Sequence, residues 1–314
     1  MNYSPKVFAV IPIRNRKDKT LRFLKRFIDQ TYENLHIVLV DANSTDGTQD
    51  VIVSLYPQVT LIDVDDECYW TASTNKGIEY SLNNQADFIL TINDDSYVDI
   101  NYVRDLVGLA IKYDTDILGS RIDYMDHPGL IWSLGSYSNW GTKNILQLSY
   151  NKCWIDNLPH SIADQEVIKV EALAGNGVLI KKTVFKKIGL YNEKFLPHYH
   201  ADSELIMRAV KNSIQPFAST NVVVYNDCVD FFGKPQYSWK QALTYPIRYA
   251  KDFFVKRNHV YFIPIIYITL TYCPLVKKIP TLISFFFISL FIPLKEVTLI
   301  RTRIKRFLSR NIMN

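Results

Sequence analysis

The first 120 residues alternate between short apolar runs and stretches with helical spacing, and this alternation constrains the fold more than any other feature. Apolar strands are expected at residues 7–13, 35–40, 59–64 and 86–92. Helices are expected at residues 18–30, 71–83 and 101–112, and a further helix is expected to end at residue 55. Parallel strands need crossover connections of this length, which helices usually supply. The sequence therefore predicts an α/β fold with a doubly wound, mostly parallel, Rossmann-like sheet.

The fourth expected strand runs directly into a cluster of polar and acidic residues. Residues 88–96 read FILTINDDS, so Asn93, Asp94 and Asp95 follow an apolar run. Open α/β sheets bind ligands at the carboxyl ends of their strands, and Mg²⁺ and Mn²⁺ prefer oxygen ligands. The cluster therefore predicts a divalent cation that holds substrate phosphates. The alternative interpretation is an acidic turn that simply ends the strand.

Polar residues also end the first two expected strands. Asn15 follows the first strand and Asp41 ends the second, so both are expected to converge with Asp94 and Asp95 at one edge of the sheet. Asp41 would accept hydrogen bonds from a base or ribose, whereas Asp95 would meet a metal and a diphosphate. The chain contains neither GxGxxG nor GxxxxGK[ST], so a cation, not a glycine-rich loop, is expected to hold the phosphates.

A second informative block combines glycines with a carboxylate. The run Gly175-Asn176-Gly177 would let a ligand approach the backbone closely. Further on, Asp202 has His198 and His200 close by, an arrangement suited to a general base and an extra metal ligand. Asp202 could instead cap a helix that begins at Ser203, and the histidines could be ordinary surface or core residues.

Residues 121–165 are less regular and rich in aromatic residues. They include Trp132, Trp140 and Trp154 without a clear helical period. Two interpretations stay open: an inserted hairpin that stacks on an acceptor sugar, or a β-rich cover for one end of the sheet.

The C-terminal region is apolar and then basic. Two uncharged stretches, 260–276 and 279–294, are separated by two lysines, contain prolines and are shorter than the ~20 residues of a spanning helix. The last twenty residues carry six basic side chains and one acid, so their net charge equals the +5 of the whole chain. We expect a re-entrant or interfacial hairpin whose basic tail meets anionic lipid headgroups. The alternative is a pair of ordinary core helices with a solvated tail.

Four scattered cysteines, without a CxxC pair, suggest neither a zinc site nor a disulfide framework. The N-terminus enters the first expected strand at once, without the pattern of a signal peptide. Together these features predict a reducing, cytoplasmic location.

Four segments, in this order and spacing, resemble the family 2 glycosyltransferases: FAVIPIRNR, IVLVDANSTDGT, YWTASTNKGIEYSL and FILTINDDS. The resemblance covers residues 7 to about 212 and is nearest to bacterial rhamnosyl- and galactofuranosyltransferase-like members. It implies the A-type glycosyltransferase fold, a nucleotide diphospho-sugar donor and a divalent metal, Mg²⁺ or Mn²⁺.

The resemblance also implies roles for individual residues. Asp41 would contact the nucleotide base, and the acidic motif would bind the ribose and the metal, with Asp95 and Asp94 as metal ligands. The other residues assigned to donor binding are Pro12, Arg14, Asn15, Asn75, Lys76 and Asn93, of which Asn93 stands where many members have an acid.

The catalytic base of the family maps to Asp202, with Glu204 as the second candidate. Ala201 replaces the acid that usually precedes the base, and Arg208 completes the pattern. The metal-binding histidine found further on in many members is missing from residues 222–230, which leaves His198 as a substitute ligand.

These observations predict an inverting glycosyltransferase that moves a sugar from a UDP- or dTDP-sugar to a lipid-linked or oligosaccharide acceptor. We expect residues 1–240 to form the catalytic domain, with a nucleotide-sugar half (1–120) and an acceptor half (121–240), and residues 241–314 to form a membrane-associating helical region. This hypothesis also implies a location at the cytoplasmic face of a bacterial inner membrane, a role in O-antigen or capsule synthesis, and no nucleic-acid partner. The alternatives are a degenerate sugar- or nucleotide-binding membrane protein and, less favoured because the loop after the first strand lacks glycine, a sugar nucleotidyltransferase.

Overall fold

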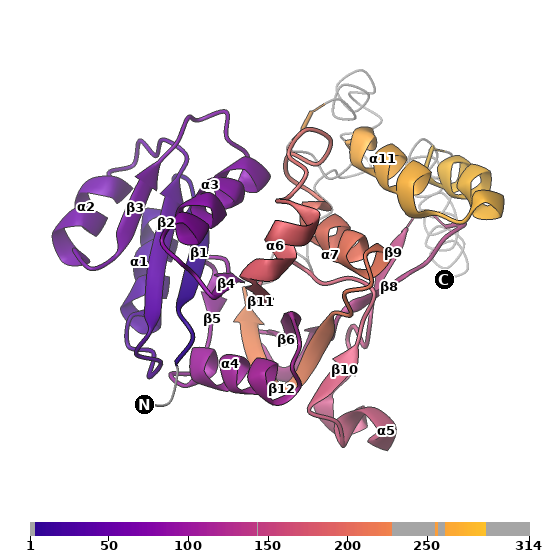
Figure 1. Ribbon diagram of the computed structural model, residues 1–314, viewed down its shortest axis with the longest axis horizontal. Helices are drawn as coiled ribbons and strands as arrows, with labels where there is room; N and C mark the ends of the chain where they lie inside the picture. The colour runs from indigo at the N-terminus through magenta and orange to yellow at the C-terminus, as the bar shows by residue number, and fades with distance from the viewer. Residues whose placement is uncertain (1–3, 143, 228–254, 257–260, 287–314) are drawn as a thin grey trace, which may run out of the picture. The chain divides into compact units, whose positions relative to one another are not determined.

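The computed structural model describes residues 4–142, 144–227, 255–256 and 261–286 (Figure 1). Contacts within the chain define two compact units, one of residues 1–138 with 146–228 and one of residues 139–145 with 229–314. The expected boundary at residue 240 lies outside the described residues, so the two-domain division stays a prediction.

The first unit is built on a ten-stranded sheet with the order β10-β12-β6-β11-β4-β1-β2-β3, from which β5 pairs with β12 and β7 with β6. The strands are β1 Val7–Ile13, β2 Leu35–Asp41, β3 Thr60–Asp63, β4 Phe88–Thr91, β5 Ser96–Tyr97, β6 Ile117–Tyr124, β7 His127–Ser133, β10 Val167–Lys169, β11 Val178–Lys181 and β12 Phe217–Asn226. The helices are α1 Lys17–Phe27, α2 Thr48–Leu55, α3 Trp70–Asn83, α4 Tyr102–Lys112, α5 His160–Ala163, α6 Lys182–Ile188 and α7 Ala201–Lys211, with a short 3₁₀ helix at Ile155–Asn157.

Strands β3, β2, β1 and β4 run parallel, as the alternation of apolar runs and helices predicts. Ile13 lies opposite Asp41 in the register, so the ends of β1 and β2 are level. The strand β11 departs from this pattern because it is inserted antiparallel to both β4 and β6. The α/β, mostly parallel architecture is thus confirmed, with β11 reversed at its centre and β5, β7 and β10 also antiparallel to the strands they pair with.

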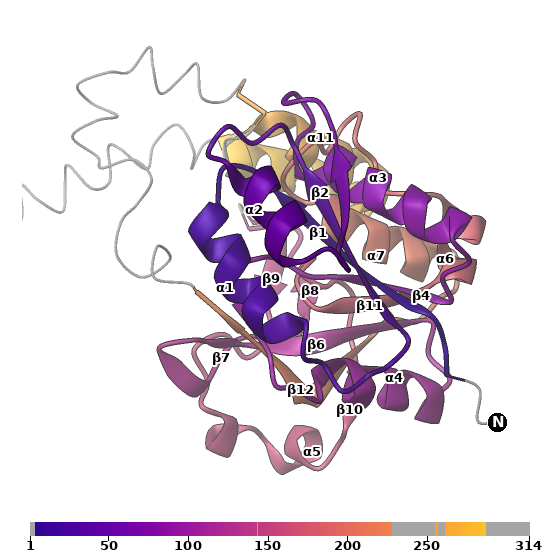
Figure 2. The ribbon, with the colours of Figure 1, turned by 90° about the vertical axis from the view of Figure 1, so that its left-hand side faces the viewer.

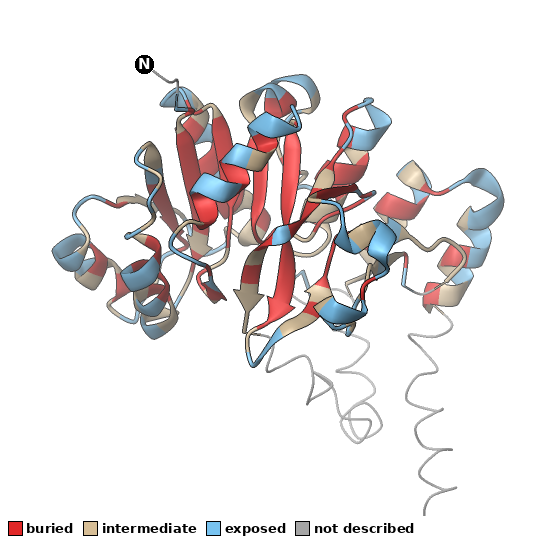
Figure 3. Ribbon diagram, turned by 90° about the horizontal axis from the view of Figure 1, so that it is seen from below, coloured by how far each residue is buried: buried red, intermediate tan, exposed pale blue. Residues whose placement is uncertain are grey.

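Helices cover both faces of the sheet, as expected for a doubly wound fold (Figure 2). The odd-numbered residues of β1 belong to one apolar core together with Phe23, Leu24 and Phe27 of α1 and with residues of α2 and α4. On the other face, Gly77 of α3 lies so close to Val10 and Val40 that a Cβ atom would clash with them. The strands between these layers are buried almost throughout (Figure 3).

Residues 121–165 are β-rich where they are described. The strand β7 extends the main sheet, and β8 (Ser136–Ser138) pairs with β9 (Leu146–Leu148) in a separate two-stranded sheet. Trp132 packs against the core, whereas Trp154 is 47% exposed. This arrangement matches the β-rich interpretation, and contact with an acceptor stays a prediction.

The described part of the second unit contains α11 (Phe262–Tyr272) and a further helical stretch at 275–286, with a break at Cys273 and Pro274. Among the described residues, no helix has both the length and the apolar character needed to cross a membrane. The basic tail lies outside the described residues.

Candidate active site

The loops that follow β1 and β2 are joined by side-chain hydrogen bonds. Asn15 has a left-handed backbone conformation (φ 48°), its N–H donates to Ser44 Oγ (2.7 Å), and its Oδ1 accepts from Thr45 N–H (2.8 Å). The convergence expected for Asn15 and the end of β2 is therefore present in the structure.

Asp41 is fully buried at the end of β2. Its carboxylate accepts hydrogen bonds from the backbone N–H and the hydroxyl of Ser44 and from Nε2 of Gln49 (2.6 Å). Because both oxygens hold the turn after β2, Asp41 shapes the edge of the sheet in this structure. Its contact with a nucleotide base stays a prediction.

Pro12 lies near the end of β1, and Arg14 directly follows that strand. Pro12 stands opposite Val40 in the register of β1 and β2. Arg14 donates to the backbone oxygen of Asp66 and lies 3.6 Å from its carboxylate. Arg14 therefore links the loop after β1 to the loop after β3, and its role toward a donor stays a prediction.

The acidic motif after β4 is neutralised by α1 and the loop before it. Arg16 contacts Asp94 Oδ1 through NH1 (3.1 Å) and Asp95 Oδ2 through NH2 (2.7 Å), and Thr20 Oγ1 donates to Asp94 Oδ2 (2.8 Å). Burial raises the pKa of Asp94 to about 6, against the opposing effects of Arg16 and Thr20. Burial alone would lower the pKa of Arg16, but Asp94 and Asp95 outweigh it and raise that pKa.

The oxygens of this motif fit a cation. Asp95 Oδ1 is buried and accepts no hydrogen bond within the described part of the chain, whereas Asp94 Oδ1, which also accepts none there, lies 3.1 Å from Arg16 NH1. A buried carboxylate oxygen without a partner is costly unless it coordinates a metal, so Asp95 Oδ1 suits an added divalent ion. In that same part of the chain no three His, Cys, Asp or Glu side chains cluster closely enough to ligate one ion, so His198 does not complete a site with Asp94 and Asp95. His198 instead stacks edge-on against Tyr199, with ring centroids 4.7 Å apart.

Trp70 connects the acidic motif to the second half of the sheet. Its indole Nε1–H donates to Asn93 Oδ1 (3.4 Å), and its ring approaches Gly175 so closely that a Cβ there would lie 2.9 Å from Cη2. Asn93 N–H donates to Asn176 Oδ1 (3.0 Å). The sequence predicts that a ligand approaches the backbone at Gly175. In the structure, side chains of the protein itself occupy the space beside this glycine.

Asp202 ends a series of contacts that runs from Asn93 through Trp70 and Gly175, which we call the strip. Its Oδ2 accepts from Gly175 N–H (2.7 Å) and its Oδ1 from Ser203 N–H (2.8 Å). The helix α7 already begins at Ala201 with His200 as N-cap residue, so the alternative that Asp202 caps a helix from Ser203 is wrong. Burial lowers the pKa of His200, which the neighbouring Asp202 opposes, so the imidazole beside Asp202 is neutral at pH 7.

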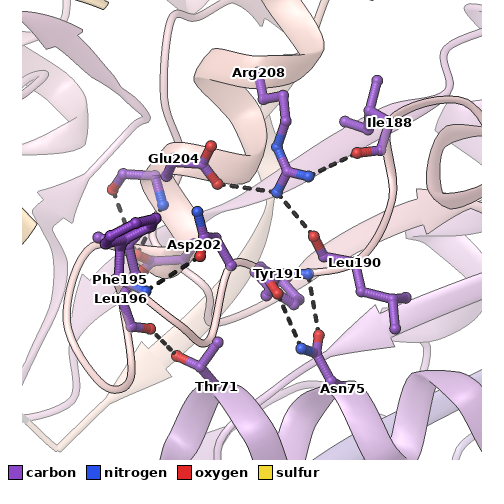
Figure 4. Close-up of polar contacts among 12 residues, drawn as sticks. Thr71, Asn75, Ile188, Leu190, Tyr191, Phe195, Leu196, Asp202, Glu204 and Arg208 are labelled. Carbon is purple, nitrogen blue, oxygen red and sulfur yellow. Dashed lines mark hydrogen bonds and ion pairs between the residues drawn. The ribbon is translucent and has the colours of Figure 1, made fainter. Parts of the chain in front are cut away.

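Glu204 points away from this strip. It is fully buried and forms an ion pair with Arg208 (2.9 Å), whose guanidinium also donates to the backbone oxygens of Ile188 and Leu190 (Figure 4). A carboxylate committed in this way cannot easily take a proton from a substrate, so the geometry does not suit the second candidate for a base.

Asn75 joins α3 to the segment that leads into α7 (Figure 4). Its Nδ2 donates to Tyr191 O (2.9 Å), and its Oδ1 accepts from Tyr191 N–H (3.0 Å). One turn earlier, Thr71 Oγ1 donates to Leu196 O (2.6 Å). Asn75 thus has a structural role, and its contact with a donor stays a prediction. Lys76 is exposed and pairs with Glu79 (3.1 Å).

Three residues of the site escape prediction from the sequence: Arg16, Thr20 and Trp70. Each lies within or next to a quoted segment, but its partner is far away in the sequence. A cation shortly after the first strand, with adjacent acids after the strand that pairs with it in the sheet, is the signal that could have identified Arg16.

The order of the strands and the site at their carboxyl edge define an A-type glycosyltransferase fold. Similar solved structures share it: TarS residues 1–349 of S. aureus, in complex with UDP (TM-score 0.52, 14% identity, 72% of this chain and 62% of that one), and GalNAc-T7 with UDP, GalNAc and Mn²⁺ (TM-score 0.58, 15% identity, 72% and 44%).

The profile of Glycosyl transferase family 2 matches residues 8–175, and the chain belongs to this family. It is 22% identical to the glycosyltransferase GlyA of Streptococcus pneumoniae over 58% of this chain and 25% of that protein. It is 24% identical to GlyG of the same organism over 39% of this chain and 41% of that protein. The chain thus spans less than half the length of these two curated relatives. The predicted family is confirmed.

The raised pKa of Asp94 predicts a pH-dependent stability. A carboxyl whose pKa rises from 3.8 to about 6 on folding binds more protons in the folded state, so its contribution to stability is greatest at low pH and is lost as the pH rises through about 6. We expect the unfolding free energy of the metal-free wild type, relative to Asp94→Asn, to fall by about 2 kcal/mol from pH ~4.5 to ~7.5. Urea unfolding at several pH values measures this difference. Asp126→Asn, at an exposed position, is the control, and a pH-independent difference for Asp94→Asn would contradict the account.

The paired hydrogen bonds of Asn75 predict that Asn75→Ala destabilises the fold. Leaving the buried N–H and C=O of Tyr191 without partners should lower the unfolding free energy by about 2 kcal/mol. Denaturant unfolding tests this, with Lys76→Ala at the exposed neighbouring position as the control. Calorimetry with UDP completes the test: unchanged stability with weakened nucleotide binding would restore Asn75 to the donor pocket.

Proposed function

We propose that this protein transfers a sugar from a UDP- or dTDP-sugar donor to a hydroxyl group of a lipid-linked or oligosaccharide acceptor. The observation that carries the proposal is the strip from Asn93 through Trp70 and Gly175 to Asp202. It places an acidic pair at one end and a separate, oriented carboxylate at the other. The solved neighbours that contain UDP, one of them with Mn²⁺, support the choice of donor.

On the donor side, Asp95 would hold Mg²⁺ or Mn²⁺, assisted by Asp94. When bound, such an ion would stabilise the negative charge of the departing nucleoside diphosphate. Arg16 already brings one positive charge to both carboxylates, and it would keep them oriented while the donor binds. Asn93, beside them, offers an amide to the ribose.

On the acceptor side, Asp202 is the proposed general base. The backbone N–H groups of Gly175 and Ser203 each donate to one of its oxygens, which fixes the orientation of the carboxylate that would meet an acceptor hydroxyl. Asp202 would take the hydroxyl proton as the oxygen forms a bond to the anomeric carbon, while the bond from that carbon to the diphosphate breaks. Attack from the face opposite to the leaving group inverts the configuration.

The acceptor and the place of action are also proposals. The apolar C-terminal stretches and the basic tail support a peripheral or monotopic enzyme at the cytoplasmic face of a bacterial inner membrane. A lipid-linked sugar of an O-antigen or capsule would be within reach there.

A second candidate function is a sugar- or nucleotide-binding membrane protein that has lost catalysis. Ala201 and Asn93, which replace acids usual in the family, favour it. A nucleotidyltransferase is less favoured because the loop of Arg14 and Asn15 has no glycine to cradle a triphosphate.

Replacement of Asp202 tests the proposal. We expect Asp202→Asn to lower kcat by about 10²–10⁴-fold, because a general base is removed, while binding of the donor nucleotide is unchanged. Turnover of a panel of UDP- and dTDP-sugars with Mg²⁺ or Mn²⁺ measures this loss, and NMR of the product reports the anomeric configuration.

Ser203→Ala, in the same turn of α7, is the matched control and should retain activity. A retained anomeric configuration, or near-normal turnover by Asp202→Asn, would contradict the mechanism. Nucleotide binding without any transfer or hydrolysis would favour the degenerate binding protein.

A further inference from the structure

Four large apolar side chains of the C-terminal helical stretch 275–286 are exposed on one side. The exposed fractions are 81% for Leu275, 83% for Val276, 70% for Ile279 and 54% for Ile283. At 100° per residue, their positions i, i+1, i+4 and i+8 fall within about 100° of the helix circumference. We call this side the apolar face. A contiguous exposed apolar patch marks an interaction surface, whereas single exposed apolar residues need no explanation.

The other side of the same helix is packed, so the apolar face is the side left over. Thr281 is fully buried and its hydroxyl accepts from Gly141 N–H (2.8 Å), while Ser284 donates to Gly141 O (3.0 Å). The rings of Phe262 at the start of α11 and Phe286 at the end of the stretch lie 6.5 Å apart. The two helices therefore form an antiparallel hairpin that buries one side of the stretch and leaves the apolar face outside.

The charges around the apolar face select the kind of partner. Residues 261–286 contain no Asp or Glu, and their only charged side chains are Lys277 and Lys278. Lys278 Nζ donates to Leu270 O (2.6 Å), and Leu270 is itself 54% exposed. The basic tail follows within ten residues of the described hairpin. Apolar side chains bordered by cations, without acids, are complementary to the surface of a lipid membrane that is apolar inside and anionic at its headgroups.

Within the described stretch 275–286, the exposed apolar side chains gather on one side of the helix, whereas its other side packs against Gly141 and α11. A helix with one exposed apolar side and cations beside it is suited to lie in the plane of a membrane interface.

We propose that the apolar face, formed by Leu275, Val276, Ile279 and Ile283, docks on the surface of an anionic membrane, with Lys277 and Lys278 at the level of the headgroups. The inference deepens the proposed function, on whose membrane location it rests, by naming the contact surface.

Flotation of the full-length protein with vesicles tests this surface. We expect binding to vesicles of phosphatidylglycerol and phosphatidylcholine, and at least a roughly tenfold weaker partition for Val276→Gln/Ile279→Gln. Lys277→Gln/Lys278→Gln should weaken binding to the anionic vesicles by roughly tenfold and leave any binding to pure phosphatidylcholine unchanged. Both pairs are solvent-exposed or nearly so, and thermal unfolding checks that the variants fold.

The matched control is Val53→Gln/Leu55→Gln on α2, where the exposed fractions are 64% and 61%. This variant should bind vesicles like the wild type. Wild-type protein that fails to bind anionic vesicles, or equal binding by Val276→Gln/Ile279→Gln, would overturn the proposal. So would a wild-type dimer that these substitutions dissociate, because the face would then cover a second copy.

Transfer of sugar to a soluble acceptor separates this inference from the proposed function. It should be unchanged in every variant of the hairpin. Loss of vesicle binding with intact transfer supports the docking surface, whereas absent transfer in the wild type with intact vesicle binding refutes the proposed function alone.

Discussion

The contact between Arg16 and the acidic pair Asp94 and Asp95 is the interaction on which the site depends. Burial takes hydration from the Asp94 carboxylate and raises its pKa, and repulsion from the adjacent Asp95 adds a smaller effect in the same direction. Arg16 and Thr20 oppose both effects, from the loop before α1 and from α1 itself. The position of α1, the position of the end of β4 and the charge of the site therefore depend on one another. The buried Oδ1 of Asp95, which accepts no hydrogen bond in the described residues, suits one more cation.

A second set of contacts brings the proposed base to the same strip. Thr71 and Asn75, one turn apart on α3, hold the backbone at Leu196 and Tyr191, just before α7. Trp70 starts the same helix and touches both Asn93 and the region of Gly175. The single helix α3 thus positions Asn93 and the approach to Asp202. Its packing against β1 and β2 makes that position depend on the core.

The parallel strands β1, β2 and β4 were predictable because buried parallel strands are continuous apolar runs between turn residues. The convergence of Asn15 and Asp41 at one edge of the sheet followed from that topology. The antiparallel direction of β11 did not, because four residues carry no signal of direction and their partners β4 and β6 lie far back in the chain. The structural role of Asn75 was not predictable for a related reason: its hydrogen bonds to Tyr191 span 116 residues of sequence. Glu204 and Asp202 occupy the same short motif, and only the packing of Arg208 shows which carboxylate is committed to the fold.

Calorimetric titration with UDP and dTDP tests the central claim, that Asp94 and Asp95 form a cation site for a nucleotide diphosphate. The account predicts that Mg²⁺ or Mn²⁺ strengthens binding of one nucleotide by at least about tenfold in the wild type, and that this gain disappears in Asp95→Ala while the protein stays folded. Nucleotide binding that is indifferent to both ions, or a full metal-dependent gain in Asp95→Ala, would contradict it.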